Sequence, residues 1–151
     1  RPHPDTIRKF KNHYVELKDK YKNKFIFEEQ ISTMDSFYKS SLMISDWSGA
    51  ALEFALGQEK PVIFVDVPKK INNVDFNLYK NIPIEISIRQ KIGEVISVSN
   101  IENINNLIDS VYSKRNSYKE NIIKARKSLL YNVGNSSKVG AQFINNMIDK
   151  T

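Results

Sequence analysis

Short apolar segments alternate with helical segments in the middle of this chain. An apolar run at residues 42–44 leads into a small polar turn, an Ala-rich stretch at about 50–56, and a second apolar run at 62–65. Apolar runs bounded by turn residues predict buried strands, and the Lys60-Pro61 pair marks the break before the second one. This order predicts a strand–turn–helix–strand unit.

The segment before residue 42 is predicted to contain two helices and a strand. Apolar residues at helical spacing predict a helix over residues 6–21, with Asp5 as its cap. A strand is expected at residues 25–27, and a short helix within 32–41 with Asp35 near its start. The expected buried stripe of the first helix is formed by Ile7, Phe10, Tyr14, Leu17 and Tyr21.

After residue 66 the pattern is less regular. An Asn- and Pro-rich segment extends to residue 83 and predicts a surface loop, whose length suggests a functional role. Beyond it we expect two short edge strands, at 84–88 and 95–98, separated by a turn at 89–93.

The last third of the chain is predicted to be helical. One long amphipathic helix, or two, covers about 101–130, and residues 131–135 interrupt it. A last helix, capped by Ser136 or Ser137, covers about 136–150.

The alternation of strands and helices predicts an α/β fold: a Rossmann-like parallel sheet flanked by helices. With 151 residues, of which 40% are hydrophobic and 26% charged, the chain fits a single domain over 1–151 with its own core. No apolar run approaches the ~20 residues that a membrane span needs. Cysteine is absent, which excludes disulfides and thiolate metal sites and fits a reducing compartment.

The chain begins Arg1-Pro2-His3-Pro4, without an initiator Met. Two prolines in this position are typical of a turn that leaves an earlier element. We therefore expect a piece of a longer protein, whose missing amino-terminal domain carries part of the function.

The net charge of +6 favours anionic partners: nucleotide phosphates, anionic polymers or an anionic membrane face. The lysines are spread along predicted helix faces, so solvated helix surfaces explain the charge equally well. Aromatic and basic residues are not interleaved on one surface, and nucleic acid is therefore not an expected partner.

The segment Ser45-Asp46-Trp47-Ser48-Gly49 follows a predicted strand and precedes a predicted helix. Ligands of open α/β sheets bind at this point, where unpaired backbone N–H groups and the helix dipole attract phosphate. Ser48 can donate its hydroxyl and Gly49 lets an anion come close, although Ser48 can also be simply the helix N-cap. Asp46 would repel a diphosphate, so we expect it, with Ser45, to support the site by orienting a hydroxyl or a histidine.

Four separated motifs occur in an order and spacing characteristic of one family: RPHP at 1–4, SDWSG at 45–49, KPVI at 60–63 and NVGNSS at 132–137. Together they resemble the C-terminal domain of CDP-glycerol glycerophosphotransferases, the wall teichoic acid primases and polymerases. The resemblance implies the GT-B architecture, in which two Rossmann-like domains enclose the active site and the C-terminal half holds the donor nucleotide. The family usually has a second Ser or Thr where Gly49 stands.

The resemblance gives His3 the role of the catalytic histidine, either as the base or as a contact to donor phosphate. A histidine titrates near neutrality and can accept the proton of an attacking hydroxyl. Without the resemblance, His3 is a turn histidine with no chemistry. Arg1 can pair with phosphate in bidentate fashion.

The resemblance also implies that the Gly-x-Ser region with Ser136 and Ser137 binds donor phosphate, although a plain helix cap explains these serines nearly as well. Glu53, one turn into the helix after Gly49, is the implied ribose ligand; an exposed helix glutamate is the alternative. Arg89 and the Lys69–Lys70 pair are supporting phosphate candidates.

The implied activity is transfer of glycerol phosphate from CDP-glycerol to a lipid-linked or polymer hydroxyl acceptor, in the synthesis of teichoic acid or a related cell-surface polymer. The enzyme would be cytoplasmic or peripheral at the anionic inner face of the membrane. No cofactor besides the nucleotide donor is expected, and His3 and His13 do not have metal-ligand spacing. A GT-B glycosyltransferase that uses a nucleotide sugar and a non-catalytic nucleotide-binding module are the alternatives.

Overall fold

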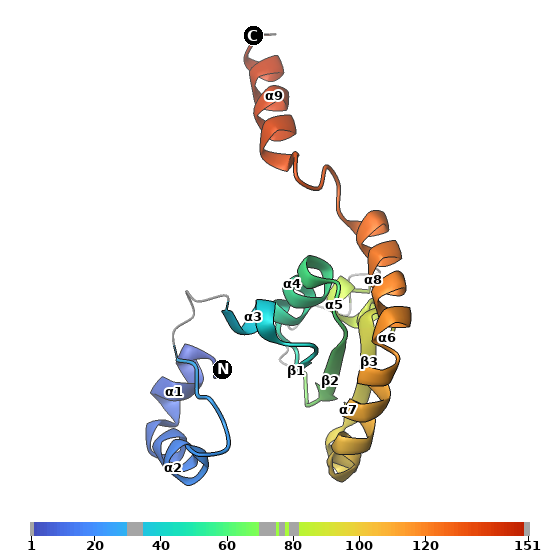
Figure 1. The fold of residues 1–151 in the computed structure, drawn as a ribbon. Coiled ribbons are helices and arrows are strands. Elements are labelled where there is room, and N and C mark those ends of the chain that lie inside the picture. The colour runs from blue at the N-terminus through green and yellow to red at the C-terminus, as the bar shows by residue number, and fades with distance from the viewer. Residues whose placement is uncertain (1, 30–34, 70–74, 76–77, 79–81, 150–151) are drawn as a thin grey trace. The chain divides into compact units, whose positions relative to one another are not determined.

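Figure 1 shows a computed structural model of the chain, which describes residues 2–29, 35–69, 75, 78 and 82–149. The chain divides into two compact units, Arg1–Lys39 and Ser40–Thr151. The sequence predicts a single domain over 1–151, whereas the contacts of the structure gather within these two units.

The first unit contains the helices α1 (Pro4–Lys9), α2 (Lys11–Tyr21) and α3 (Asp35–Lys39). The short helix with Asp35 at its start is confirmed. The helix expected over 6–21 is interrupted at Phe10, whose φ of −123° and ψ of 41° are not helical. Asp5 was the wrong choice of cap, because the cap is His3, whose Nδ1 accepts the backbone N–H of Asp5 at 3.1 Å.

The apolar stripe of the first unit lines an open hollow instead of a closed core. No residue of α1 or α2 is fully buried. The hollow has a volume of about 430 Å³ and is lined by residues of α1, α2 and the segments beside them, most of them aromatic or apolar. Its apolar lining includes Phe10, Tyr14, Leu17, Tyr21, Phe25, Ile26 and Phe27.

Residues 25–27 are not a strand, so this prediction was wrong. Their aromatic rings pack on α2 instead. Phe25 lies edge-on to Tyr21 with ring centroids 5.8 Å apart, and Phe27 lies edge-on to Tyr14 at 6.1 Å. Such contacts hold the segment against a helix without any strand pairing.

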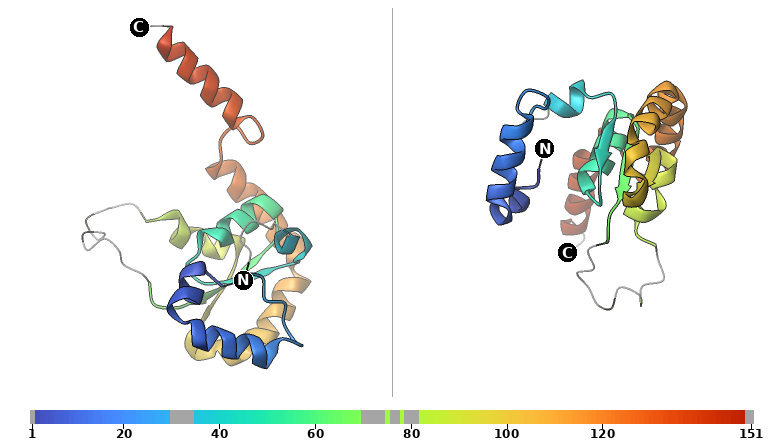
Figure 2. Two further views of the ribbon diagram at one scale, coloured as in Figure 1. Left: turned by 90° about the vertical axis from the view of Figure 1, so that its left-hand side faces the viewer. Right: turned by 90° about the horizontal axis from the view of Figure 1, so that it is seen from below.

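The second unit is built on three parallel strands, β1 (Met43–Ser45), β2 (Val62–Asp66) and β3 (Gly93–Ser97), in the order β1-β2-β3. Ser45 pairs with Phe64 in the register, and Asp66 pairs with Ser97. The strands have helices packed against them (Figure 2), which confirms the predicted α/β fold with a Rossmann-like parallel sheet.

The strand expected at 84–88 and the turn expected at 89–93 are both wrong, because two short helices cover 84–87 and 89–92, whereas the strand expected at 95–98 is confirmed as β3. The amphipathic stretch 101–130 forms two helices, one of the two arrangements predicted. The part of the chain that the structure describes contains no helix long and apolar enough to cross a membrane. The helical elements of this unit are α4 (Gly49–Gln58), α5 (Ile84–Ser87), α6 (Arg89–Ile92), η2 (Val98–Asn103), α7 (Ile104–Ser113), α8 (Arg115–Leu129) and α9 (Ser136–Ile148).

The two faces of β2 contact different helices, because side chains alternate along a strand. On one face Ile63 packs with Val111 of α7. On the other face Phe64 lies under Arg89 of α6, with their guanidinium carbon and ring centroid 4.9 Å apart. α6 therefore packs on the second face, near the carboxyl end of β2.

The start of α9 differs from the prediction that Ser136 or Ser137 caps it. Asn135 holds the cap position without a side-chain hydrogen bond, and Ser136 is the first helical residue. The Ser136 hydroxyl lies 2.9 Å from the carbonyl oxygen of Asn132, so it donates to the preceding turn.

Candidate functional site

The carboxyl ends of the three parallel strands meet at one edge of the sheet. β1 ends at Ser45, β2 at Asp66 and β3 at Ser97. In open α/β sheets, ligands bind outside this edge, next to the amino termini of the helices that follow the strands. The predicted phosphate turn, residues 45–49, therefore lies at this carboxyl edge.

Ser48 caps α4 at the carboxyl edge, as predicted. Its backbone is extended (φ −113°, ψ 134°), and its Oγ accepts the N–H of Ala50 at 3.3 Å. Gly49 follows as the first helical residue and is exposed, and a Cβ built on it would meet no atom within 4 Å. An anion can therefore approach the first turn of α4, where backbone N–H groups and the helix dipole favour negative charge.

The sequence also explains where α4 ends. Glu59 adopts the left-handed conformation (φ 57°), and its N–H donates to the carbonyl of Ala55 at 2.9 Å. Pro61 follows and cannot continue a helix. Buried Ala51 and Phe54 fix the helix against its neighbours, so its amino terminus is held at the carboxyl edge.

Glu53 lies on the same exposed side of α4 as Gly49. Both residues are exposed, and they are four positions apart, which places them one above the other on a helix. The helical rise separates their Cα atoms by about 6 Å along the axis. This placement suits the predicted division between phosphate at the helix start and a sugar one turn further on.

Trp47 joins the turn after β1 to the segment after β2. Its Nε1 donates to the carbonyl oxygen of Val67 at 2.8 Å. Its ring also carries two cations: the guanidinium carbon of Arg89 lies 3.9 Å from the ring centroid, and Nζ of Lys69 lies 5.3 Å from it. Cations in these positions are attracted by the negative face of the indole.

Arg89 is buried at this edge and lies in a helix, not in the turn predicted over 89–93. Only 5% of the residue is exposed. It begins α6, and its side chain reaches the carboxyl end of β2, where Nη1 donates to Oδ1 of Asp66 at 2.8 Å. The Asp66 side chain is 48% exposed, so solvent reaches the pair from the Asp66 side.

Two nitrogens of Arg89 are buried without a hydrogen-bond partner among the described residues. These are Nε and Nη2. Buried polar groups are nearly always hydrogen-bonded, and a charged group left without partners is especially costly. This guanidinium therefore differs from an ordinary structural ion pair, in which every donor is used.

The supporting residues Ser45 and Asp46 lie at the edge but make no side-chain contact that defines a role. Ser45 is half-buried at the end of β1, and Asp46 is exposed. Neither side chain has a hydrogen bond or ion pair within the described part of the chain. That they orient a hydroxyl or histidine stays a prediction.

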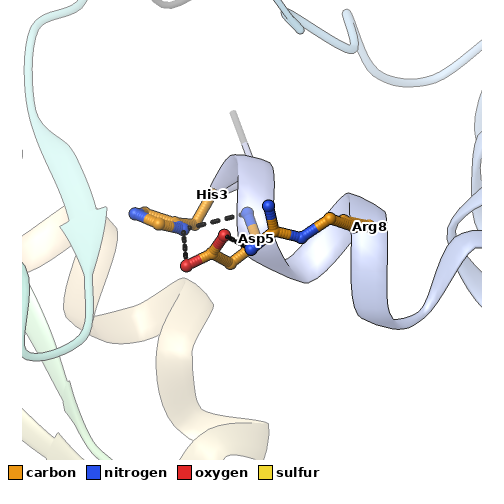
Figure 3. Close-up of polar contacts among 3 residues, drawn as sticks. All are labelled: His3, Asp5 and Arg8. Carbon is orange, nitrogen blue, oxygen red and sulfur yellow. Dashed lines mark hydrogen bonds and ion pairs between the residues drawn. The ribbon is translucent and has the colours of Figure 1, made fainter.

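His3 belongs to the first unit, where it interacts with Asp5 at the start of α1 (Figure 3). Asp5 in turn forms an ion pair with Arg8, whose Nη2 lies 2.5 Å from its Oδ1. Nδ1 of His3 also lies 3.8 Å from Oδ2 of Asp5, so the backbone N–H and the carboxylate of Asp5 both face the same ring nitrogen. The other ring nitrogen of His3, Nε2, takes no part in these contacts.

The remaining predicted phosphate ligands are not brought to the carboxyl edge by any contact described. Ser136 and Ser137 lie in a stretch where every residue from 130 to 149 is exposed, and Ser136 bonds within its own turn. Arg1 and Lys70 lie outside the described residues.

The prediction overlooked Asp66 and left the role of Trp47 open. The sequence did contain a signal for Asp66, because an acidic residue at the end of an apolar strand lies at the carboxyl edge of a parallel sheet. Its pairing with Arg89 could not be read from the chain, since the two residues are 23 positions apart and the segment around Arg89 was predicted as a turn.

Within the described residues, no three His, Asp or Glu side chains gather in a group that could hold a metal ion. Comparison with family models, curated proteins and solved structures finds no match for this chain.

Proposed function

We propose that this chain is the donor-binding domain of a CDP-glycerol glycerophosphotransferase, which transfers glycerol phosphate to a hydroxyl acceptor of teichoic acid or a related cell-surface polymer. The observation that carries the proposal is the Ser48-capped amino terminus of α4 at the carboxyl edge of a parallel sheet. CDP-glycerol is proposed as the donor from the resemblance of the four motifs to this family, because the geometry alone supports a phosphorylated ligand without naming it.

In the proposed reaction, an acceptor hydroxyl attacks the β-phosphorus of CDP-glycerol. A new O–P bond forms, the bond from that phosphorus to the bridging oxygen breaks, CMP leaves with the electron pair, and the proton of the acceptor hydroxyl is released to water. The first turn of α4 stabilises the negative charge of the diphosphate, and Ser48 adds its hydroxyl. Positioning and charge stabilisation provide most of the rate in such transfers.

Glu53 is the proposed ribose ligand, because it stands one turn beyond the phosphate-binding end of α4 and is exposed. A carboxylate accepts hydrogen bonds from two adjacent hydroxyls. His3 belongs to the first compact unit, and its role as the base or as a phosphate contact stays a prediction from the resemblance.

The test is ligand-induced thermal stabilisation of the full chain, because a ligand that binds the folded state raises Tm. CDP-glycerol is expected to raise Tm more than a UDP-sugar at the same concentration. A larger shift with the UDP-sugar would support a nucleotide-sugar glycosyltransferase instead. No shift with any nucleotide would remove the proposal.

Ser48→Ala is expected to weaken CDP-glycerol binding about three- to tenfold, since it removes one hydrogen bond to the ligand. The variant also loses a helix cap, so affinity is compared by calorimetry at a temperature where both proteins are folded. Ser117→Ala, an exposed position on α8, is the matched control and should bind like the parent chain. Equal affinity for Ser48→Ala and Ser117→Ala would contradict the phosphate role of Ser48.

A further inference from the structure

Arg89 presents an unused pair of donors at the carboxyl edge. Its ion pair with Asp66 uses Nη1, whereas Nε and Nη2 have no hydrogen-bond partner among the described residues. Nε–H and Nη2–H point the same way from a guanidinium. They form the side of the group that grips two oxygens of one anion at once.

Aromatic rings enclose the guanidinium of Arg89 in this structure. The guanidinium lies against the ring of Trp47 and against the ring of Phe64, and 5% of the residue is exposed. A cation held in this way interacts strongly with an anion, because little solvent screens the charges.

Arg89 also lies close in the fold to the amino terminus of α4. Trp47, which the guanidinium contacts, directly precedes the cap residue Ser48, and Asp66 ends the strand next to β1. Lys69 adds a second positive charge over the same indole. Two positive charges therefore lie close to the Trp47 ring.

We propose that Arg89 is a second anion-binding group of the carboxyl edge, which receives a phosphoryl group through Nε and Nη2. Asp66 holds the guanidinium in place by Nη1 and competes electrostatically with the ligand. A phosphoryl group enters from the exposed Asp66 side and draws the guanidinium from beneath the indole. The first turn of α4 and Arg89 then bind the two phosphoryl groups of one diphosphate.

This inference deepens the proposed function and depends on it only for the identity of the nucleotide. The alternative is that Arg89 has only a structural role and links Trp47 to Asp66. The two cases differ in what happens when Asp66 loses its charge. A structural link through Arg89 becomes weaker, whereas an anion site at Arg89 binds its anion more tightly.

The test measures binding of inorganic pyrophosphate to the full chain by isothermal titration calorimetry. Arg89→Lys keeps the charge but loses the paired donors, and we expect about tenfold weaker binding. Asp66→Asn removes the competing carboxylate, and we expect about threefold tighter binding. The matched controls are Arg115→Lys on α8 and Asp109→Asn on α7, both exposed, which should bind as the parent chain does.

Unchanged or weaker pyrophosphate binding by Asp66→Asn would overturn the inference, and so would no binding by the parent chain. If Arg89→Lys does not fold, as judged by circular dichroism, the Asp66→Asn result alone decides. Pyrophosphate binding with the expected dependence, but no stabilisation by any nucleotide, would support the Arg89 site and refute the proposed function. Stabilisation by CDP-glycerol that neither Arg89→Lys nor Asp66→Asn changes would support the proposed function and refute the Arg89 site.

Discussion

Gly93 begins β3 where the neighbouring strand leaves no room for a side chain. A Cβ built on Gly93 would lie 1.7 Å from the carbonyl oxygen of Val62, its partner in the register. That atom belongs to the backbone of β2, so it cannot move aside without disturbing the pairing of the two strands. The choice of glycine here is therefore steric.

We expect Gly93→Ala to lower the free energy of unfolding by about 3 kcal/mol or more, because either β2 or β3 must shift. Urea unfolding followed by circular dichroism measures the change. A loss below about 1 kcal/mol would mean that the sheet tolerates a methyl group at this position.

Single residues also show what a sequence can and cannot reveal. Ser48 was predictable as a cap, because a serine before an Ala-rich stretch is a local signal. The burial of Arg89 was not predictable, because it depends on Trp47, Phe64 and Asp66, which contact Arg89 only in the folded chain. His3 took the cap role expected of Asp5, since either side chain can accept an N–H at a helix start.

The elements α5 and α6 illustrate an ambiguous pattern. Isoleucines at 84, 86 and 88 alternate as in a strand, but 84, 88 and 92 have the spacing of a helix face. The helical choice buries Ile88 and Ile92. By contrast, the segments that form β1, α4 and β2 are apolar stretches bounded by turn residues, and their prediction is confirmed.

α4 contains a glycine at a position that does not require one. Gly57 lies in the last turn, is exposed, and a Cβ built on it would meet no atom within 4 Å. Gly57→Ala should therefore stabilise the protein by up to about 1 kcal/mol, because alanine restricts the unfolded chain and favours the helix.

Thermal unfolding of Gly57→Ala measures this gain, and the nucleotide response should remain that of the parent chain, since Gly57 lies two turns from Ser48. A lower Tm for Gly57→Ala would show that this turn of α4 needs glycine for a reason absent from its surroundings.

At the scale of the whole molecule, the α/β class and the parallel sheet followed from the order of the elements. The two compact units were not predicted, although the residues before the boundary at 39 and 40 are more highly charged than those after it. The location of the candidate site followed from the fold class, whereas its second cation depended on packing between α6 and β2. Topology was thus more predictable than the contacts that complete the site.

The free energy of unfolding should depend on pH through a contact between α8 and the sheet. Burial, and then the hydrogen bond that Tyr118 donates to Glu94, raise the pKa of Tyr118 to about 12 from 10.0. A raised pKa of a phenol means that the folded state retains the proton longer than the unfolded state. The stabilisation is therefore complete below pH 10 and is lost as the pH rises through 12.

Urea unfolding at pH values from about 9 to 12 tests this dependence, with Tyr118→Phe as the comparison. The variant lacks the ionisable phenol, so its free energy of unfolding should fall less steeply across this range. Tyr14, whose pKa burial and Glu29 also raise, is present in both proteins and cancels in the comparison. Parallel slopes for the two proteins would show that Tyr118 does not contribute.

Trp47 is the chain's single tryptophan, and it lies at the carboxyl edge with a hydrogen bond at Nε1 and a guanidinium over its ring. Indole fluorescence excited at the red edge of protein absorption therefore arises from this one place. Its intensity and wavelength respond to the charge above the ring and to the bond with Val67. The protein thus carries its own optical reporter of events beside Ser48 and Arg89, with no label and no emission from a second indole.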